Sequence, residues 1–251
     1  MAGHSKWANI KHRKAAQDAK KGKVFTRLIR EITISARLGG SNIDDNPRLR
    51  TAIDKALEAN MTRDTIDRAT KRGAGEEDAD NLEELVYEGY AVGGVAVLVE
   101  AMTDNRNRTV AEVRHAFSKF GGNLGTDGSV AYLFEKRGEF FFEPNVTNEE
   151  TLMDVALEAG ADDIVHNDDD SLEVYASPIV FNEVKAALKD AKIPYVQAEI
   201  NMAASVQVEL DLDTATTVLK MIDRLEELDD VQNVYSNAEF TEEVLNAIDS
   251  Q

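Results

Sequence analysis

Hydrophobic residues recur at helical spacing three times within the first 75 positions of the chain. The first set shares one face of a predicted helix over residues 24–40 and comprises Val24, Leu28, Ile32 and Ala36. A second helix is expected over residues 46–60, with Asn46 as its N-cap and Pro47 as its first residue. A third is expected over residues 62–73, where Gly73 is a stop signal. The pattern therefore predicts a small three-helix domain.

After an acidic, glycine-containing linker over residues 73–84, the pattern changes to alternating strands and helices. A buried strand is expected over residues 94–102, a helix over 109–120 and another strand over 129–134. The next elements are predicted as strand, helix, strand, strand, helix and strand, over residues 139–143, 148–159, 162–166, 171–176, 177–191 and 195–200. This order is the signature of a ferredoxin-like fold.

The last part of the chain repeats the order strand, helix, strand over residues 205–210, 213–228 and 231–236. We expect these elements to complete the sheet that residues 94–134 begin, with the ferredoxin-like series inserted between them. The predicted fold class is α+β with three domains. These are an N-terminal three-helix domain (1–78), a middle α/β domain split in sequence (79–134 plus 204–251) and an inserted ferredoxin-like α/β domain (135–203).

The composition indicates a folded protein without thiol chemistry. The 251 residues are 43% hydrophobic and 30% charged, and they include no cysteine, which excludes disulfides, thiol nucleophiles and thiolate metal sites. The longest apolar stretch, residues 91–99, is far shorter than the roughly 20 residues that a membrane span needs. Lysines and arginines interrupt any apolar segment of a secretory signal near the N-terminus. We therefore expect a cytoplasmic protein that makes no membrane contact.

The formal net charge of −19 averages two regions of opposite sign. Residues 1–75 contain 17 Lys+Arg and 8 Asp+Glu, a net charge of +9, whereas residues 76–251 contain 11 and 39, a net charge of −28. Phosphate binding requires local positive potential, so the first region suits nucleic acid although the whole chain does not. The acidic remainder is expected to be a solvated surface, with docking of a basic protein partner as an alternative.

The polar stretch over residues 1–23 combines cations with an aromatic ring and hydrogen-bonding groups. A solvated basic helix face is the simplest interpretation, but Trp7 adds the capacity to stack on a base or wedge between bases. Because no recognition-helix motif is evident, binding is expected to be independent of nucleotide sequence. The residues expected to contact nucleic acid are His4, Ser5, Lys6, Trp7, Lys11, His12, Arg13, Lys14, Lys20, Lys21 and Lys23.

Two further polar segments are ambiguous. The glycine-rich residues 121–129 lack the lysine of a phosphate-binding P-loop and are expected to form a structural turn, with a backbone-amide anion site as the alternative. In residues 104–109, Arg106 and Arg108 are rare cations within the acidic region. Ion pairing, with an N-cap from Asn107, is slightly favoured there over a secondary contact with nucleic acid.

The sequence indicates no catalytic residue, metal site or cofactor. None of the four histidines occurs at the spacing of a metal-binding motif, and His115 is expected to have a surface or packing role. The acidic residues after His166 lack the central glycine and distal glutamate of a calcium loop. A metal-dependent hydrolase that uses the acidic region is therefore a remote alternative.

The string MAGHSKWANIKHRKAAQDAKKGKVFTRLIREI, residues 1–32, closely resembles the opening of the YebC family. Shorter strings that look like motifs of that family occur at residues 46–50, 60–64, 87–90, 104–109 and 121–125. The resemblance implies three domains, one inserted in another, and no catalytic activity. It also implies a bacterial-type cytoplasmic member, because the family motif begins at Met1.

Two hypotheses follow for function. The resemblance implies a transcriptional regulator that binds DNA, and this non-enzymatic role is our leading hypothesis. Within the same family a mitochondrial relative acts as a translational activator and ribosome association is reported, so the alternative is a ribosome-associated translation factor that contacts RNA. The sequence does not decide between DNA and RNA, because stacking by Trp7 suits both.

Overall fold

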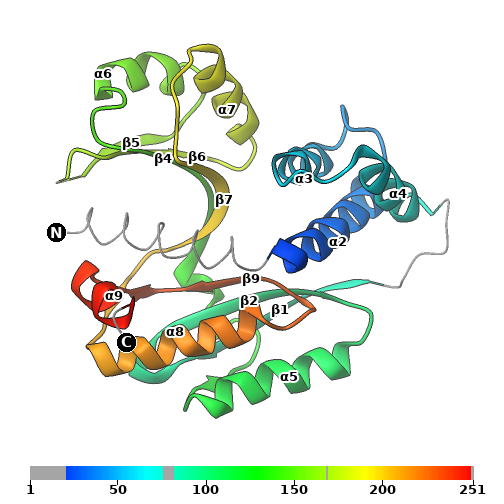
Figure 1. Ribbon diagram of the computed structural model, residues 1–251, viewed down its shortest axis with the longest axis vertical. Coiled ribbons are helices and arrows are strands. Elements are labelled where there is room, and N and C mark those ends of the chain that lie inside the picture. The colour runs from blue at the N-terminus through cyan, green and yellow to red at the C-terminus, as the bar shows by residue number, and fades with distance from the viewer. Residues whose placement is uncertain (1–20, 76–81, 168, 250–251) are drawn as a thin grey trace. The chain divides into compact units, whose positions relative to one another are not determined.

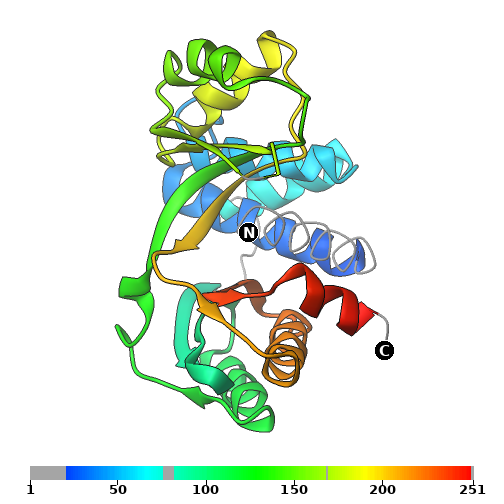
Figure 2. The ribbon, with the colours of Figure 1, turned by 90° about the vertical axis from the view of Figure 1, so that its left-hand side faces the viewer.

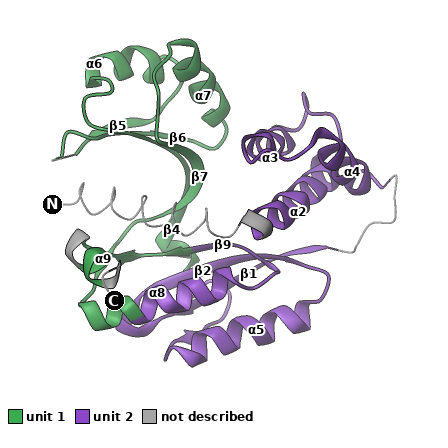
Figure 3. Ribbon diagram, in the orientation of Figure 1, with its two compact units in different colours: residues 1–12, 130–216, 235–251 green, residues 13–129, 217–234 purple. Residues whose placement is uncertain are grey.

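The computed structural model describes residues 21–75, 82–167 and 169–249 (Figures 1 and 2). These residues form two compact units, coloured separately in Figure 3. Unit 2 contains the described residues up to Ser129 together with residues 217–234, and unit 1 contains residues 130–216 and those from Tyr235 onward. Among the described residues, no helix is long and apolar enough to cross a membrane. Each unit is described separately below.

Unit 2 begins with the three predicted helices. They are α2 (Lys21–Gly39), α3 (Pro47–Glu58) and α4 (Arg63–Gly73). Their shared core consists of Ile32, Ala36, Leu49, Ala52, Ala56, Met61, Ile66 and Ala69. The predicted cap at Asn46 is confirmed, and Thr62, the expected first residue of the third helix, is the N-cap of α4. The periodicity of apolar residues was therefore sufficient to locate this helical part.

Asn46 connects the ends of α2 and α3 through both of its side-chain polar atoms. Its Oδ1 accepts the N–H of Leu49 at 3.0 Å, and its Nδ2 donates to the carbonyls of Ser35 and Gly40 at 2.8 Å each. The residue is 4% exposed, so water cannot replace these bonds.

Replacing Asn46 by Ala is expected to lower the free energy of unfolding by about 2 kcal/mol. An N-cap contributes about 1 kcal/mol, and the carbonyl of the buried Ser35 and that of Gly40 also lose their donor. The matched control is Thr62→Ala, which removes an exposed cap whose bond to the Thr65 N–H is 3.4 Å long. Its expected loss is below about 1 kcal/mol. Equal losses in urea unfolding of the two variants would contradict this assignment.

The sheet of unit 2 has the strand order β3-β1-β2-β9. Its strands are β1 (Glu83–Tyr90), β2 (Ala96–Thr103), β3 (Asn123–Leu124) and β9 (Val231–Ser236). A short 3-10 turn, η1 (Val92–Gly94), connects β1 to β2, which pair antiparallel along their full length. Because β9 hydrogen-bonds to β2, the end of the chain completes a sheet that begins before the ferredoxin-like series.

Helix α5 (Arg106–Lys119) packs closely on this sheet through a glycine. A Cβ atom at Gly89 would lie 2.7 Å from Cε1 of Phe117 and 2.5 Å from the carbonyl oxygen of Asn123, so only glycine fits on β1 at this point. Figures 1 and 2 show α5 and α8 (Leu212–Glu226) on the same side of the sheet.

Unit 1 contains the ferredoxin-like sheet, in the strand order β5-β6-β4-β7. Its strands are β4 (Phe134–Phe142), β5 (Asp163–His166), β6 (Leu172–Ala176) and β7 (Gln197–Ala204), and all neighbouring pairs are antiparallel. Its helices are α6 (Glu149–Leu152), which continues as the π-helical turn η3 (Met153–Leu157), and α7 (Phe181–Asp190). The predicted order of strands and helices is therefore confirmed.

Three details of the predicted fold are wrong. Residues 129–134 do not form a strand, because Ala131–Leu133 adopt a 3-10 turn (η2) and β4 begins only at Phe134. Ser177 and Pro178 do not cap α7, which begins at Phe181, where the ring stacks on Phe140 with centroids 4.8 Å apart. Strand β1 and the elements after residue 236 were not predicted.

A further prediction is wrong, because the strand expected over residues 205–210 does not join the sheet of unit 2. It is reduced to β8 (Val208–Glu209), which pairs in parallel with β10 (Ala238–Glu239) in a separate two-stranded sheet. Helix α9 (Glu242–Asp249) follows β10. The fold class, a mixture of helices and sheets with an N-terminal helical part, is confirmed. The domain boundaries expected near residues 78, 134 and 204 stay a prediction.

Candidate nucleic-acid interface

Most residues predicted to contact nucleic acid lie outside the described part of the chain. These are His4, Ser5, Lys6, Trp7, Lys11, His12, Arg13, Lys14 and Lys20. Lys21 is the first residue of α2, and its side chain is also not described. Of the predicted residues, Lys23, Arg106 and Arg108 therefore have described surroundings, and all three belong to unit 2.

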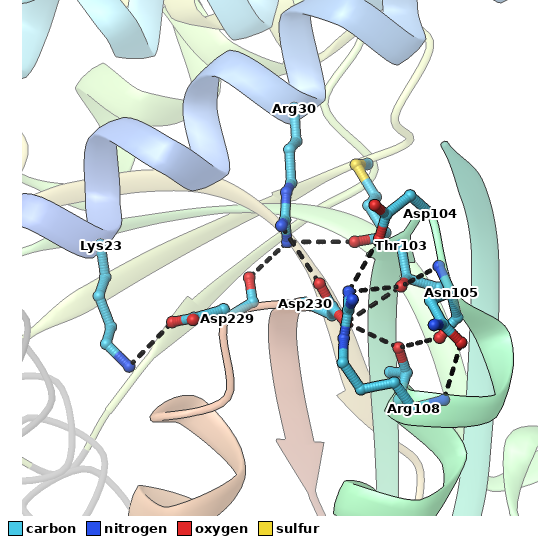
Figure 4. A network of polar contacts seen from close by, with 10 residues as sticks. Lys23, Arg30, Thr103, Asp104, Asn105, Arg108, Asp229 and Asp230 are labelled. Atoms are coloured by element: carbon cyan, nitrogen blue, oxygen red, sulfur yellow. Dashed lines mark hydrogen bonds and ion pairs between the residues drawn. The ribbon is translucent and has the colours of Figure 1, made fainter. Parts of the chain in front are cut away.

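Three cations on one face of α2 contact backbone carbonyls at the carboxyl end of α8 and in the turn that follows it, and Figure 4 shows two of these cations, Lys23 and Arg30. Lys23 donates to the carbonyl of Glu227, and Arg27 donates to that of Glu226 at 2.5 Å. Arg30 donates to the carbonyl of Asp229. The last carbonyls of a helix, here that of Glu226, have no partner within the helix and carry partial negative charge, so cations are favoured there. Burial lowers the pKa of Arg27, an effect that the nearby Glu226 partly offsets. These contacts attach the beginning of α2 to the α/β part of unit 2.

A buried carboxylate, Asp230, lies at the centre of the polar cluster in Figure 4. Its side chain is 2% exposed, and its Oδ2 accepts from Nη2 of Arg108 at 2.7 Å, from Thr109 Oγ1 at 2.8 Å and from Thr103 Oγ1 at 3.0 Å. Its Oδ1 lies 3.2 Å from Nη2 of Arg30. One carboxylate thus connects α2, β2 and α5.

The surroundings of Asp230 favour its charged form. Burial on its own raises the pKa of this carboxyl group, but hydrogen bonds from Arg108, Thr109 and Thr103 outweigh that effect and hold the pKa below its usual range. The same contact raises the pKa of Arg108, which also pairs with Asp104 at 2.8 Å. Arg108 therefore forms ion pairs in the structure, which is the interpretation that the sequence slightly favoured.

The predicted N-cap at Asn107 is wrong. Helix α5 begins directly after β2, so the cap falls on Asn105, whose Oδ1 accepts the N–H of Arg108 at 3.1 Å. Asn107 lies in the first turn and is exposed. Arg106 is also exposed and forms no hydrogen bond or ion pair with any other described residue, so it stays a candidate for secondary phosphate contact.

The glycine-rich segment makes its polar contacts with a buried glutamate. The carboxylate of Glu88, a residue 7% exposed, accepts the N–H of Gly128 at 2.7 Å, and its carbonyl accepts the N–H of Gly125 at the same distance. Gly121 has φ +74°, which suits the chain reversal after α5. These contacts fit the structural turn, because the Gly128 amide already binds an internal carboxylate.

The histidines with described surroundings are on the surface. His115 is exposed on α5, and His166 has its ring nitrogens 3.6 Å from Glu149 and 3.4 Å from Asp170. Within residues 21–75, 82–167 and 169–249, no group of three or more histidine, aspartate or glutamate side chains could hold a metal ion.

Sequence reasoning missed Asp230 and its connection to Arg30. Asp230 is one of 47 acidic residues, and its partners lie between 121 and 200 positions away along the chain. The only local signal is its position directly before the apolar Val231 at the start of β9.

Comparisons with known proteins cover almost the whole chain. Residues 5–76 match the profile of the "TACO1/YebC protein N-terminal domain", and residues 82–238 match that of the "TACO1/YebC second and third domain". A "Probable transcriptional regulatory protein" of Alcanivorax borkumensis is 67% identical over 95% of this chain and 96% of its own length. The "Transcriptional regulatory protein PmpR" of Pseudomonas aeruginosa is 66% identical over 98% of both chains.

A solved structure is similar as well. The crystal structure of the conserved hypothetical protein Aq1575 from Aquifex aeolicus has a TM-score of 0.77 and 48% sequence identity, and the match covers 90% of this chain and 93% of that one. Both domain profiles and the similar proteins point to the same family. The chain therefore belongs to the TACO1/YebC family.

Proposed function

We propose that the chain is a non-enzymatic regulator of transcription that binds DNA in the cytoplasm through its basic N-terminal stretch, residues 1–23. The observation that carries this proposal is the segregation of charge, +9 over residues 1–75 against −28 over residues 76–251. DNA is attracted to the first region and repelled by the second, so binding is confined to one part of the chain. The names of the relatives, regulatory proteins of transcription, agree with this class of function.

The contacts of α2 support a fixed base for the basic stretch. Lys23, Arg27 and Arg30 bind carbonyls at and just after the carboxyl end of α8, so the helix that follows the stretch is attached to the α/β part of unit 2. The Nζ of Lys23 also lies 3.6 Å from Oδ1 of Asp229, so a phosphate must compete with this carboxylate for Lys23. The cations that precede α2 are therefore expected to supply most of the phosphate contacts.

The direct test neutralises four of those cations in the full chain. We call this the arm variant, and it carries Lys6→Gln, Lys11→Gln, Arg13→Gln and Lys14→Gln. It is expected to bind duplex DNA at least about tenfold more weakly than the unmodified chain at 0.1 M salt. Fluorescence anisotropy of labelled DNA measures the affinity. The matched control, Lys136→Gln, Lys185→Gln, Lys189→Gln and Lys220→Gln, changes the net charge equally but within the acidic region. An equal loss in both variants would mean that net charge, not its position, governs binding.

A ribosome-associated translation factor is the second candidate, and Trp7 is the observation that favours it. An indole stacks well on unpaired bases, which are more accessible in RNA than in duplex DNA. Co-sedimentation of the full chain with ribosomes at moderate salt is expected if this candidate is correct, and Trp7→Ala should weaken it. Failure to co-sediment, together with tighter binding to duplex DNA than to single-stranded RNA, would exclude this candidate.

A further inference from the structure

Helix α4 presents an exposed face with an excess of positive charge. Its eleven residues include four cations and two acids, and its apolar side is buried against α2 and α3 through Ile66 and Ala69. Arg63 and Lys71 are exposed, and Arg72 is partly buried at the last turn. We call Arg63, Lys71 and Arg72 the α4 cations.

Many other cations of the helical part are occupied by internal partners. Arg48 binds Glu31 at 2.7 Å and Glu84 at 2.5 Å, and Arg68 binds Asp64 at 3.0 Å. Arg50, Lys23, Arg27 and Arg30 donate to backbone carbonyls. In contrast, the α4 cations form no hydrogen bond or ion pair with another described residue. Within the described residues, these three cations therefore have no internal anion assigned to them.

A pocket of about 220 Å³ adjoins Arg72 within unit 2. Its lining includes Thr26, Arg30, Arg72 and Asp104. Arg30 is held in place by Asp230 and by the carbonyl of Met102, so its charge is already compensated within unit 2. The carboxylate of Asp104 is compensated by Arg108 at 2.8 Å. Among the described lining residues, Arg72 is therefore the cation without a described internal partner, and it borders a space large enough for a phosphate group.

We propose that the α4 cations and this pocket form a second contact for the phosphate backbone of the nucleic acid that residues 1–23 bind. This inference rests on the function proposed above and extends its site onto α4. A planar guanidinium group can donate two parallel hydrogen bonds to two oxygens of one phosphate. The attraction between a phosphate and a partly buried guanidinium such as that of Arg72 is weakened less by water than that of a fully exposed one. Stabilisation of the α4 dipole by Lys71 and Arg72 is the simpler role, and it would affect stability rather than binding.

The test compares two double variants of the full chain with duplex DNA as the probe. Lys71→Gln with Arg72→Gln is expected to weaken binding roughly tenfold and to lower the magnitude of the slope of log affinity against log salt by about 1.8, or about 0.9 for each lost contact. The matched control is Arg50→Gln with Arg68→Gln. It removes two cations from the same group of three helices, and both of these cations already have internal partners. It is expected to keep the slope of the unmodified chain. Equal slopes for the two variants would overturn the inference.

Two further measurements keep the test decisive. If Lys71→Gln with Arg72→Gln lowers the melting temperature, Arg63→Glu with Lys71→Glu tests the same face through its exposed residues, and an unchanged affinity would overturn the inference. If the arm variant loses affinity while both α4 variants keep it, the proposed function survives and this inference fails. If the unmodified chain binds no nucleic acid, both proposals fail.

Discussion

Replacement of Asp230 by Ala is expected to lower the free energy of unfolding by about 3 kcal/mol. The substitution leaves Arg30 and Arg108 without their shared carboxylate and removes the acceptor of the buried Thr109 hydroxyl. Loss of one partner from a buried ion pair costs about 3–5 kcal/mol, and the partial exposure of the arginines places this site at the low end. The measurement is urea unfolding at neutral pH, followed by circular dichroism.

The neighbouring aspartate provides the control for this prediction. The side chain of Asp229 is 85% exposed, and it makes one ion pair, with Lys23 at 3.6 Å. Asp229→Ala is therefore expected to cost less than about 1 kcal/mol, as exposed pairs do. Similar losses in the two variants would show that the Asp230 cluster does not hold α2, β2 and α5 together.

The contribution of Asp230 is also expected to depend on pH. Its pKa is lowered in the folded protein, so its contribution is complete above the pKa of the unfolded chain, about 3.9, and disappears as the pH falls through the folded pKa. The stability difference between the unmodified chain and Asp230→Asn should therefore shrink below about pH 4. Asp211, whose pKa is lowered by bonds from Thr214, is present in both proteins and cancels. A difference that stays constant down to pH 2 would contradict this assignment.

Gly73→Val is the second substitution with a large expected effect, about 3 kcal/mol of unfolding free energy. A Cβ atom at Gly73 would lie 2.2 Å from the carbonyl oxygen of Thr33 and 2.8 Å from Cβ of Ala36. Neither the backbone of α2 nor the short Ala36 side chain can move aside, so α2 and α4 must separate. Thermal melting measures the loss. Asp67→Ala, on the exposed face of α4, is the control and should leave the melting temperature nearly unchanged. A folded Gly73→Val protein of normal stability would show that this close approach is unnecessary.

The helical part of the fold was predictable because its signals are local. The spacing of Ile32 and Ala36 defines the buried face of α2, and Asn46 and Thr62 mark the starts of α3 and α4. The ferredoxin-like order was predictable for a similar reason, since strands such as β4 and β6 contain short apolar segments, at residues 140–142 and 174–176.

Strand β1, which was not predicted, and the first residue of α7, which was predicted wrongly, both depend on contacts between distant residues. Strand β1 contains four charged or glycine positions in eight residues, and it is a strand because β2 pairs with it at every position. Helix α7 begins at Phe181 because Gly138 leaves space for that ring on β4. No local pattern predicts either contact.

The same limit applies to the candidate site. Charge counting located the basic N-terminal stretch, but it could not separate cations with internal partners from cations without them. Arg48 and Arg72 are equivalent in the sequence, yet the first is bound by two glutamates and the second faces a pocket. That distinction requires the packing of α2, α3 and α4.

The most direct test of the central claim is the salt dependence of DNA binding by the full chain and by the arm variant. About seven phosphate contacts predict a slope of log affinity against log salt of roughly −5 to −6 for the unmodified chain. Removal of four cations should reduce its magnitude by about 3 to 4. The same slope for the arm variant as for the unmodified chain, or a slope near zero for both, would contradict the proposal that residues 1–23 bind nucleic acid.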